Sequence, residues 1–536
     1  MSDQPGGEPP IFDLTPGTDV IGTPPPASRR PLVLVLGTVA VVVALLLAGA
    51  GVKRFVGTAS HAGGAAAAWV PASTFAYVQI DMNPSAEQKL ALFNFSRKFP
   101  DSPTTRPGAT ADNLRDTLLS AMIDDPDVDY AKDVKPWLGD DMALAAFSDA
   151  AGHARAVLAM GVKDRDAAAV GLKRLASKDK AKDQNDVYAV EDGYALFAPD
   201  QASLDNARAQ LAKGSLQSND TFEHDAATLP SDQLVLGWVD VGKGLRPTER
   251  LVADKGCAVL SQMMPGHQAC SVETLDKLAR AGSNHLDTTR LVLGGRVASN
   301  YVDVQLRVRG GAAGHGSDVA GMVGSLPDDT SFALGVGSVA SQLRENERLI
   351  STMPDLILPD AQGQSASDAW ATAKRQIREA TGLRYPDDFA TVLGDRAVFA
   401  MHVRPGFEQR GGVPDIGVRS TPKDLAAARR LAERFVDRAA PDAPMGVRTA
   451  GRDLVVAMGN GYAARLAEGG HLGDKALFRT AMGSLDHANV AMYMDVRAFG
   501  VSDKDAPITA VGLVMRYDGA DTVAELRVVA ADMPVE

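Results

Sequence analysis

The chain has 536 residues, of which 45% are hydrophobic and 23% are charged, and its formal net charge is -12 at pH 7. This composition is typical of a globular protein that is large enough for two or more hydrophobic cores. The acidic charge argues against nucleic acid as a partner and against adhesion to anionic lipid by charge alone. Aromatic residues make up only 5% of the chain, so stacking platforms for sugars or bases are scarce.

The first segment, residues 1–28, is rich in proline and glycine. It cannot bury enough apolar surface to fold, so we expect a disordered tail. Residues 31–52 then contain no charged side chain and are flanked by two basic pairs within residues 29–54. A helix of this length covers the roughly 30 Å hydrocarbon core of a bilayer. The sequence therefore predicts a single transmembrane helix with basic flanks.

A cleaved signal peptide and a buried core helix are the alternatives for this stretch. A signal peptide has an apolar run of about 7 to 15 residues after a short basic region. Here a long polar segment precedes a longer run, and Lys53 and Arg54 follow it directly. We therefore expect a single-pass signal anchor in the plasma membrane, with the N-terminus in the cytoplasm. Residues 55–69, which are mostly small, are the expected linker to an extracytoplasmic domain.

The expected domain contains an internal duplication. Residues 70–76 match residues 326–333, and three further landmarks recur at nearly the same spacing along the chain. These landmarks are Leu138-Gly139-Asp140 with Leu393-Gly394-Asp395, Phe222 with Phe478, and residues 229–241 with residues 485–496. The sequence therefore predicts two repeats, residues 70–309 and residues 326–532, joined by a linker over residues 310–325.

Each repeat shows the same order of patterns. In the first, a strand over residues 74–82 precedes two helical stretches, a strand pair, a helix, a short hairpin at Asp192-Gly193 and another helix. Residues 233–241, 290–298 and 302–309 complete the repeat as strands. Strands that follow one another through tight turns pair antiparallel. The predicted fold class is α+β, with one N-terminal transmembrane helix and two duplicated units whose sheets are mostly antiparallel, with helices on one face of each.

The first repeat carries an insertion over about residues 242–289. It contains Cys257 and Cys270, which are the only cysteines in the chain. Two free thiols are the alternative, but two cysteines in one local insertion of an exported domain favour a disulfide. Pro265-Gly266, midway between them, supplies a chain reversal. We therefore predict a Cys257–Cys270 disulfide.

Residues 76–100 read AYVQIDMNPSAEQKLALFNFSRKFP. The pattern resembles a family of actinobacterial single-pass envelope proteins, catalogued as domain of unknown function three-three-five-two. Asn83 stands where the family usually has aspartate. The resemblance implies a location and an architecture, but no reaction, substrate or catalytic residue. The residues that match are Pro71, Ala76-Tyr77, Asp81, Pro84-Ser85-Ala86, Gln88-Lys89, Lys98-Phe99-Pro100 and Trp137-Leu138-Gly139-Asp140.

The same motif has a structural interpretation. Ser85 followed by Gln88 fits a capping box, in which the hydroxyl and the amide satisfy backbone N–H groups at the start of a helix. Leu90, with other apolar residues of this helix, is expected to pack inward. We favour this cap over a binding role for Asp81 and Ser85.

The sequence contains no complete catalytic, cofactor-binding or metal-binding motif. Residues 237–244 have the GxxxxGK spacing of a phosphate loop, but Gly244 stands where the magnesium-binding Ser or Thr belongs. Residues 177–180 have SxxK spacing without a later KTG. The nine histidines are scattered without metal-binding spacing. We therefore assign no catalytic, cofactor-binding or metal-ligating residue.

Three functions remain open. The first is a non-catalytic binding or scaffold module of the cell envelope, the second is a carrier or chaperone for a lipid or lipoprotein, and the third is an envelope hydrolase. A closed apolar pocket would favour the carrier, whereas a polar cleft with convergent carboxylates and a histidine would favour the hydrolase. The expected partners are the bilayer, through residues 31–52, and an unidentified envelope protein or ligand.

Overall fold

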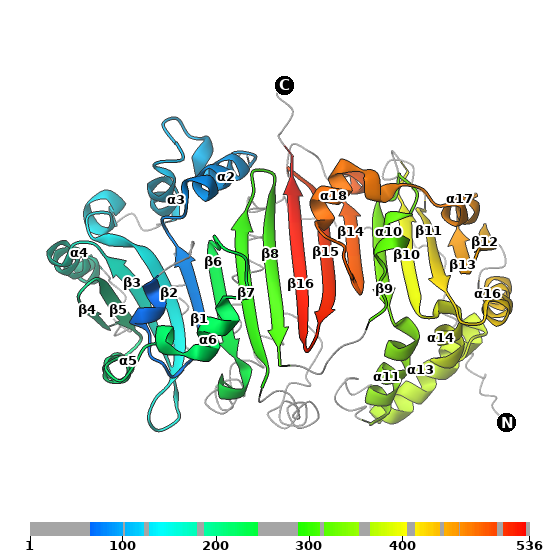
Figure 1. The fold of residues 1–536 in the computed structure, drawn as a ribbon, viewed down its shortest axis with the longest axis horizontal. Helices are drawn as coiled ribbons and strands as arrows, with labels where there is room; N and C mark the ends of the chain where they lie inside the picture. The colour runs from blue at the N-terminus through cyan, green and yellow to red at the C-terminus, as the bar shows by residue number, and fades with distance from the viewer. Residues whose placement is uncertain are drawn as a thin grey trace, which may run out of the picture.

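One antiparallel sheet of 16 strands runs through the whole folded part (Figure 1). The strand order is β12-β13-β11-β10-β9-β14-β15-β16-β8-β7-β6-β1-β2-β3-β5-β4. The computed structural model describes residues 65–99, 102–122, 128–178, 187–244, 288–310, 316–352, 365–404, 413–439, 444–459, 461–500 and 507–531.

The first half of the sheet contains strands β1 to β8. Alternating or continuous apolar patterns form these strands, and the tight turn at Asp192-Gly193 joins β4 to β5 as predicted. The elements are η3 (Ala65–Trp69), β1 (Thr74–Asp81), α2 (Ala86–Ser96), η4 (Pro103–Thr105), α3 (Leu114–Met122), η5 (Tyr130–Val134), β2 (Leu138–Ser148), β3 (Ala154–Val162), α4 (Arg165–Lys178), β4 (Val187–Val190), β5 (Tyr194–Ala198), α5 (Gln201–Leu211), η6 (Leu216–Ser218), α6 (Asp220–Ala226), β6 (Val235–Asp240), β7 (Arg290–Val297) and β8 (Tyr301–Arg309).

The second half contains strands β9 to β16. Its strand order is that of the first half with every number raised by eight. The elements are α10 (Ala320–Gly324), β9 (Phe332–Gly337), α11 (Val339–Thr352), α13 (Ala366–Thr381), α14 (Asp387–Leu393), β10 (Arg396–His402), β11 (Asp415–Thr421), α16 (Leu425–Ala439), β12 (Met445–Ala450), β13 (Asp453–Met458), α17 (Tyr462–Glu468), η8 (Leu472–Asp474), α18 (Ala476–Met482), β14 (Val490–Asp495), η9 (Val496–Phe499), β15 (Ile508–Asp518) and β16 (Asp521–Ala530).

The two halves join where β8 pairs with β16. Gln305 lies opposite Glu525, and each is the fifth residue of its strand. Equivalent positions therefore face each other, and the two halves are related by an approximate twofold axis at this point. Asp303 and Arg527 also lie opposite each other, and the Arg527 guanidinium lies 4.8 Å from the centre of the Tyr301 ring.

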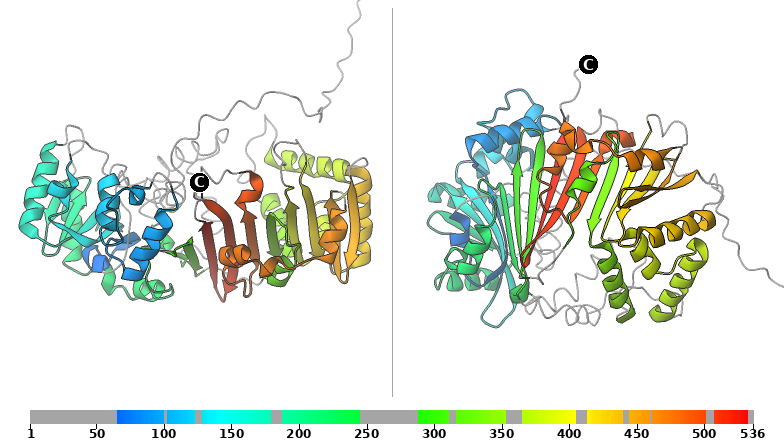
Figure 2. Two further views of the ribbon diagram at one scale, coloured as in Figure 1. Left: turned by 90° about the horizontal axis from the view of Figure 1, so that it is seen from above. Right: turned by 45° about the vertical axis from the view of Figure 1, so that its right-hand side comes forward.

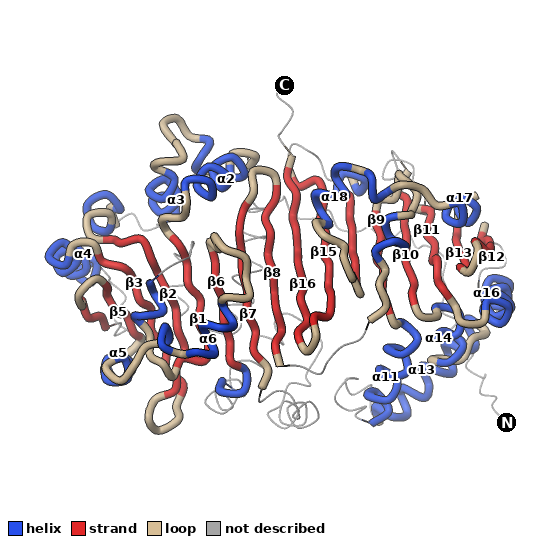
Figure 3. Tube along the Cα trace, viewed as in Figure 1, coloured by secondary structure: helices blue, strands red, loops and turns tan. Residues whose placement is uncertain are grey.

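The sheet has helices on both faces. We call the face with η3, α5, α6, α10, α17 and α18 the front face (Figure 3). The main front-face cores correspond between the halves: Val70, Leu216 and Phe222 in one, and Leu326, Leu472 and Phe478 in the other. On the back face α3 and α4 cover the first half, whereas α14 and α16 cover the outer strands of the second half (Figure 2).

The centre of the back face is apolar, and the described residues cover it only in part. Every second side chain of β8 points to this face and is half-buried, and the side chains between them point to the front face. The residues on this face are Val302, Val304, Leu306 and Val308. Similar half-buried side chains extend across the neighbouring strands of the centre. Among the described helices, α2 packs at one edge of this surface, against Val297 and Val302. The neighbouring side chains are Leu291, Leu293, Val490, Met492, Met494, Val511, Leu513, Met515 and Leu526.

The predicted fold class is wrong about the sheets. We expected a separate sheet in each α+β unit with helices on one face, whereas a single sheet runs through both halves and carries helices on both faces. The reason is that β8 and β16 would each be an edge strand in a separate unit, with unpaired N–H and C=O groups. Their mutual pairing satisfies these groups. The predicted bounds of the two repeats, 70–309 and 326–532, stay predictions.

Two further predicted features are not part of this fold. The transmembrane helix over residues 31–52 and the Cys257–Cys270 disulfide fall outside the described residues. Within the described ranges no helix combines the length and the apolar character that a bilayer crossing requires, and no disulfide bond is present. We therefore correct the fold class to one antiparallel sheet with helices.

The expected linker over residues 55–69 ends in a structured element. Its last residues form η3, in which Ala66 and Ala67 are buried in the front-face core of the first half. Their small side chains fit against a sheet surface that already carries the ring of Tyr77. The alanines of η3, which we expected to be part of a linker, therefore belong to the hydrophobic core.

Candidate functional site

A polar cavity of about 540 Å³ opens on the front face of the first half. Its walls come from η3, β1, η6, α6 and the start of β6, so they unite segments that are far apart in the sequence. The volume lies within the range of small-molecule sites. The lining residues are Ala67, Gln79, Asp81, Gln217, Phe222, Glu223, Ala226, Asp232, Gln233 and Leu236.

Gln79 provides a buried hydrogen-bond donor to this cavity. The residue is 4% exposed, and its Oε1 accepts a hydrogen bond of 2.7 Å from the Tyr77 hydroxyl. Burial, and then the Asp141 carboxylate, raise the pKa of Tyr77 well above its usual value, so the phenol stays protonated and can donate. The Gln79 amide nitrogen is left without a hydrogen-bond partner among the described residues. The residue lines the cavity, so this N–H group is open from that side and can donate to a ligand acceptor there.

Asp81 lies two residues further along β1, on the same side of the strand. Its Oδ1 accepts a hydrogen bond of 2.8 Å from the Asn83 backbone N–H. Burial raises the pKa of Asp81 to about 6, and the neighbouring carboxylates of Asp141 and Asp140 add to this rise. A carboxylate that is partly desolvated and lies among other carboxylates attracts a cation.

Among the described residues of the second half, the space equivalent to this cavity is filled. Strand register places Gly335 and Gly337 where Gln79 and Asp81 lie in the first half. A Cβ on Gly335 would lie 2.6 Å from Val323 Cγ2, and one on Gly337 would lie 2.0 Å from the Ser317 carbonyl oxygen. The helix α10 therefore fills the space that is open in the first half.

The other lining positions differ between the halves in the same way. Gln217 corresponds to Gly473, where a Cβ would lie 3.3 Å from Gly324 Cα. Asp232 corresponds to His487, and both have positive φ, of 60° and 57°. The remaining pairs are Ala67 with Val323, Glu223 with Arg479 and Ala226 with Met482. Acidic and amide side chains are therefore specific to the cavity of the first half.

A buried ion-pair cluster holds α6 in place beside the cavity. Asp225 is fully buried, and its Oδ2 accepts hydrogen bonds from Trp238 Nε1 at 2.9 Å and from Arg290 Nε at 2.6 Å. Its Oδ1 accepts a bond of 2.7 Å from Arg309 Nη1. The ring of Phe222 packs edge-on against Tyr77 and Trp238. This packing connects the cavity wall to β1, β6 and β7.

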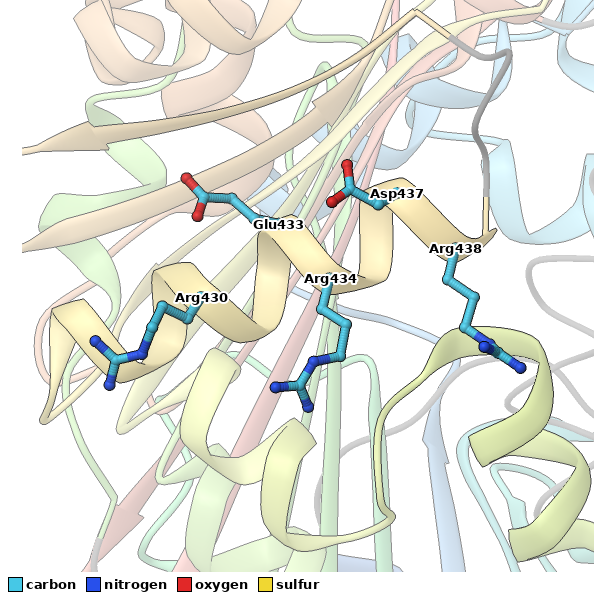
Figure 4. Close-up of a pocket in the computed structure, with 5 residues that line it drawn as sticks. All are labelled: Arg430, Glu433, Arg434, Asp437 and Arg438. Carbon is cyan, nitrogen blue, oxygen red and sulfur yellow. The ribbon is translucent and has the colours of Figure 1, made fainter.

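Two other concave surfaces lack this character. One lies along α16 and has a volume of about 530 Å³, with Arg430, Arg434 and Arg438 one turn apart (Figure 4). Arg438 already donates to the Glu379 carbonyl oxygen at 2.7 Å, and Glu433 and Asp437 lie in the same lining. This is the mixed charge of a solvated helix face. The other lies between α2 and β7, where Leu90 is 54% exposed.

The predicted helix cap is present in part. The Ser85 hydroxyl accepts a hydrogen bond of 3.3 Å from the Gln88 backbone N–H. The Gln88 side chain does not return to the cap, because its Oε1 instead accepts a bond from Val297 N at 3.3 Å. Leu90 is largely exposed, so the prediction that it packs inward is wrong. Ser85 therefore has a structural role, whereas Asp81 lies in the cavity.

The sequence interpretation missed most of the cavity. Gln79 was the available signal, because it is an amide between the apolar residues Val78 and Ile80 of β1. Its partners in the lining come from η6, α6 and the loop before β6, and no spacing in the sequence connects them. Within the described part of the chain, no three His, Cys, Asp or Glu side chains come close enough to hold a metal ion. Cys257 and Cys270 lie outside the described residues.

Comparisons with known proteins give a match to a domain of unknown function over part of the chain. A family profile described as "Protein of unknown function (DUF3352)" matches residues 32–189, a stretch that includes β1 but not α6. No curated protein matches the chain. A solved structure described as "Structure of crystal form III of TP0453" has 7% sequence identity and a TM-score of 0.23, and the match covers 49% of this chain and 86% of that chain. That similarity is too low to support an argument. The matched region of the chain is thus similar to a domain of unknown function.

Proposed function

We propose that the chain is a non-catalytic binding module of the cell envelope, and that its ligand occupies the polar cavity of the first half. The observation that carries the proposal is the Gln79 amide nitrogen, which belongs to a largely buried residue of the cavity wall and has no hydrogen-bond partner among the described residues, so it is open to a ligand in the cavity. The corresponding space in the second half is filled by α10, so the cavity is not an unavoidable result of the fold. The envelope location follows from two predictions made from the sequence, namely that residues 31–52 associate with a bilayer and that the domain lies outside the cytoplasm.

The lining favours binding over hydrolysis. It offers carboxylates and amides, but among its residues there is no histidine, serine or cysteine. A nucleophile next to a general base is the usual signature of a hydrolase site. These side chains can instead hold and orient a polar ligand through several hydrogen bonds.

The Gln79→Met variant tests this proposal. Methionine keeps the length of the side chain but removes both the amide donor and the oxygen that accepts from the Tyr77 hydroxyl. A ligand therefore loses one hydrogen bond, and the melting temperature without ligand, measured first, shows whether the variant is folded. In a screen of polar metabolites by thermal shift, ligands that stabilise the wild-type protein should bind the variant about tenfold more weakly. The matched control is Gln342→Met on α11, in the second half. Equal affinities for wild type and Gln79→Met would contradict the proposal.

One observation favours a second function, a carrier for lipid. The aliphatic and methionine side chains at the centre of the back face are half-buried over several adjacent strands. An apolar surface that is continuous over neighbouring strands can receive an acyl chain, and methionine adapts to varied apolar partners. Native mass spectrometry of the protein purified from membranes tests this function. A bound acyl lipid at about one per chain supports the carrier, and a lipid-free mass argues against it.

A further inference from the structure

We infer that the ligand of the first-half cavity carries a positively charged nitrogen, as in an amine or guanidine compound. This inference rests on the proposed function, because it names the chemical class that the same cavity accepts. Three carboxylates line the cavity, on Asp81, Glu223 and Asp232. None of the three forms a salt bridge within the described part of the chain. The lining contains no lysine or arginine to balance them.

The neighbouring elements add to the negative field. Asp141 lies opposite Asp81 on β2, and Asp140 precedes it. Arg115 pairs with Asp140 at 2.8 Å. Lys89 of α2 donates to the Asn83 side chain rather than to Asp81. The carboxylates that line the cavity are those of Asp81, Glu223 and Asp232, and a ligand can supply the positive charge that this lining lacks.

The arrangement of the carboxylates favours an organic cation over a metal ion. Within the described ranges no group of three carboxylate, imidazole or thiolate side chains is compact enough to coordinate one ion. The carboxylates come from β1, α6 and the loop before β6, and they border a cavity of about 540 Å³. Separated anionic groups around a volume of this size fit an elongated cation that contacts them at different points.

Gln79 gives the ligand a second requirement. Its amide nitrogen donates from the buried wall, so the ligand places a hydrogen-bond acceptor there while its cationic end meets the carboxylates. Phe222 contributes an apolar surface between these groups. The second half lacks this combination, since glycines replace Gln79 and Asp81, and Arg479 replaces Glu223.

Isothermal titration of the full chain with three kinds of probe tests the inference. The probes are agmatine and putrescine as cations, N-acetylglucosamine as a neutral polar compound, and glutarate as an anion. We expect saturable binding of a cation at pH 7.5 that is about tenfold weaker in Asp81→Asn. Affinity should also fall from pH 7.5 to pH 5, because Asp81, with a pKa of about 6, takes up a proton. The control Asp474→Asn, in η8 of the second half, should bind like the wild type.

The other outcomes separate this inference from the proposed function. Binding of N-acetylglucosamine or glutarate that Gln79→Met weakens and Asp81→Asn does not would overturn the cationic class and leave the cavity as the binding site. Failure of both cations to bind the wild-type protein at pH 7.5 would also overturn the inference. Thermal melts show whether Asp81→Asn folds. Because the pKa of Asp81 is raised in the folded state, its charged form destabilises the fold. At pH 7.5 the melting temperature of the wild type should therefore be lower than that of Asp81→Asn. The difference should be smaller at pH 5, where Asp81 is largely protonated in the folded protein.

Discussion

Replacing Asp225 with alanine is expected to lower the free energy of unfolding by about 3 to 5 kcal/mol. The carboxylate is fully buried and accepts hydrogen bonds from Trp238, Arg290 and Arg309. Its removal leaves the buried indole N–H without its acceptor and takes the carboxylate partner from Arg290 and from Arg309, which keep only the Thr288 carbonyl oxygen and Asp521. The loss should be measured by urea unfolding followed by tryptophan fluorescence.

The control for this experiment is Asp232→Asn, which removes an exposed carboxylate a few residues away and keeps a residue type that tolerates the positive φ of this position. Its effect should stay within about 0.5 kcal/mol, as for most surface substitutions. A loss of under about 1 kcal/mol in Asp225→Ala would show that the cluster does not hold α6 and β7 together, contrary to its geometry.

Replacing Val304 with proline is expected to destabilise the junction of the two halves by at least about 3 kcal/mol. Val304 lies in β8, between Gly295 of β7 and Leu526 of β16. Proline cannot donate to the ladder, and central strands have no place for its ring. Since β8 pairs directly with β16, calorimetry should show the unfolding transition of the halves split or broadened.

Val304→Ala provides the matched comparison, because alanine keeps the backbone donor and removes only part of a half-buried side chain. It should preserve one shared transition. If Val304→Pro melts like Val304→Ala, the continuous sheet does not couple the two halves.

Strand positions could be predicted well from the sequence, whereas the assembly of the sheet could not. The strand expected over residues 302–309 corresponds to β8, because valine and leucine alternate there with polar residues. Its pairing with β16 depends on two segments more than two hundred residues apart, and both strands have equally good partners in their own halves. The local sequence pattern of a strand does not determine which other edge strand it pairs with.

The cavity shows a second limit of sequence interpretation. The halves have related patterns, so the exchange of Gln79 for Gly335 and of Ala67 for Val323 looks like ordinary variation in a duplicated chain. Only the packing shows that these exchanges compensate each other. In the second half, small residues of the sheet pack against large residues of α10. In the first half, the large side chain of Tyr77 on the sheet packs with the small residues of η3. What remains open beside Gln79 and Asp81 is the candidate site.

The central claim is that a ligand meets the Gln79 side chain in this cavity. The most direct measurement is the side-chain amide resonance of Gln79 in protein labelled with ¹⁵N-glutamine, assigned by its disappearance in Gln79→Met. Titration with a ligand that stabilises the protein should shift this resonance with the same dissociation constant that calorimetry gives. A ligand that binds with high occupancy and leaves the resonance unmoved would contradict the account.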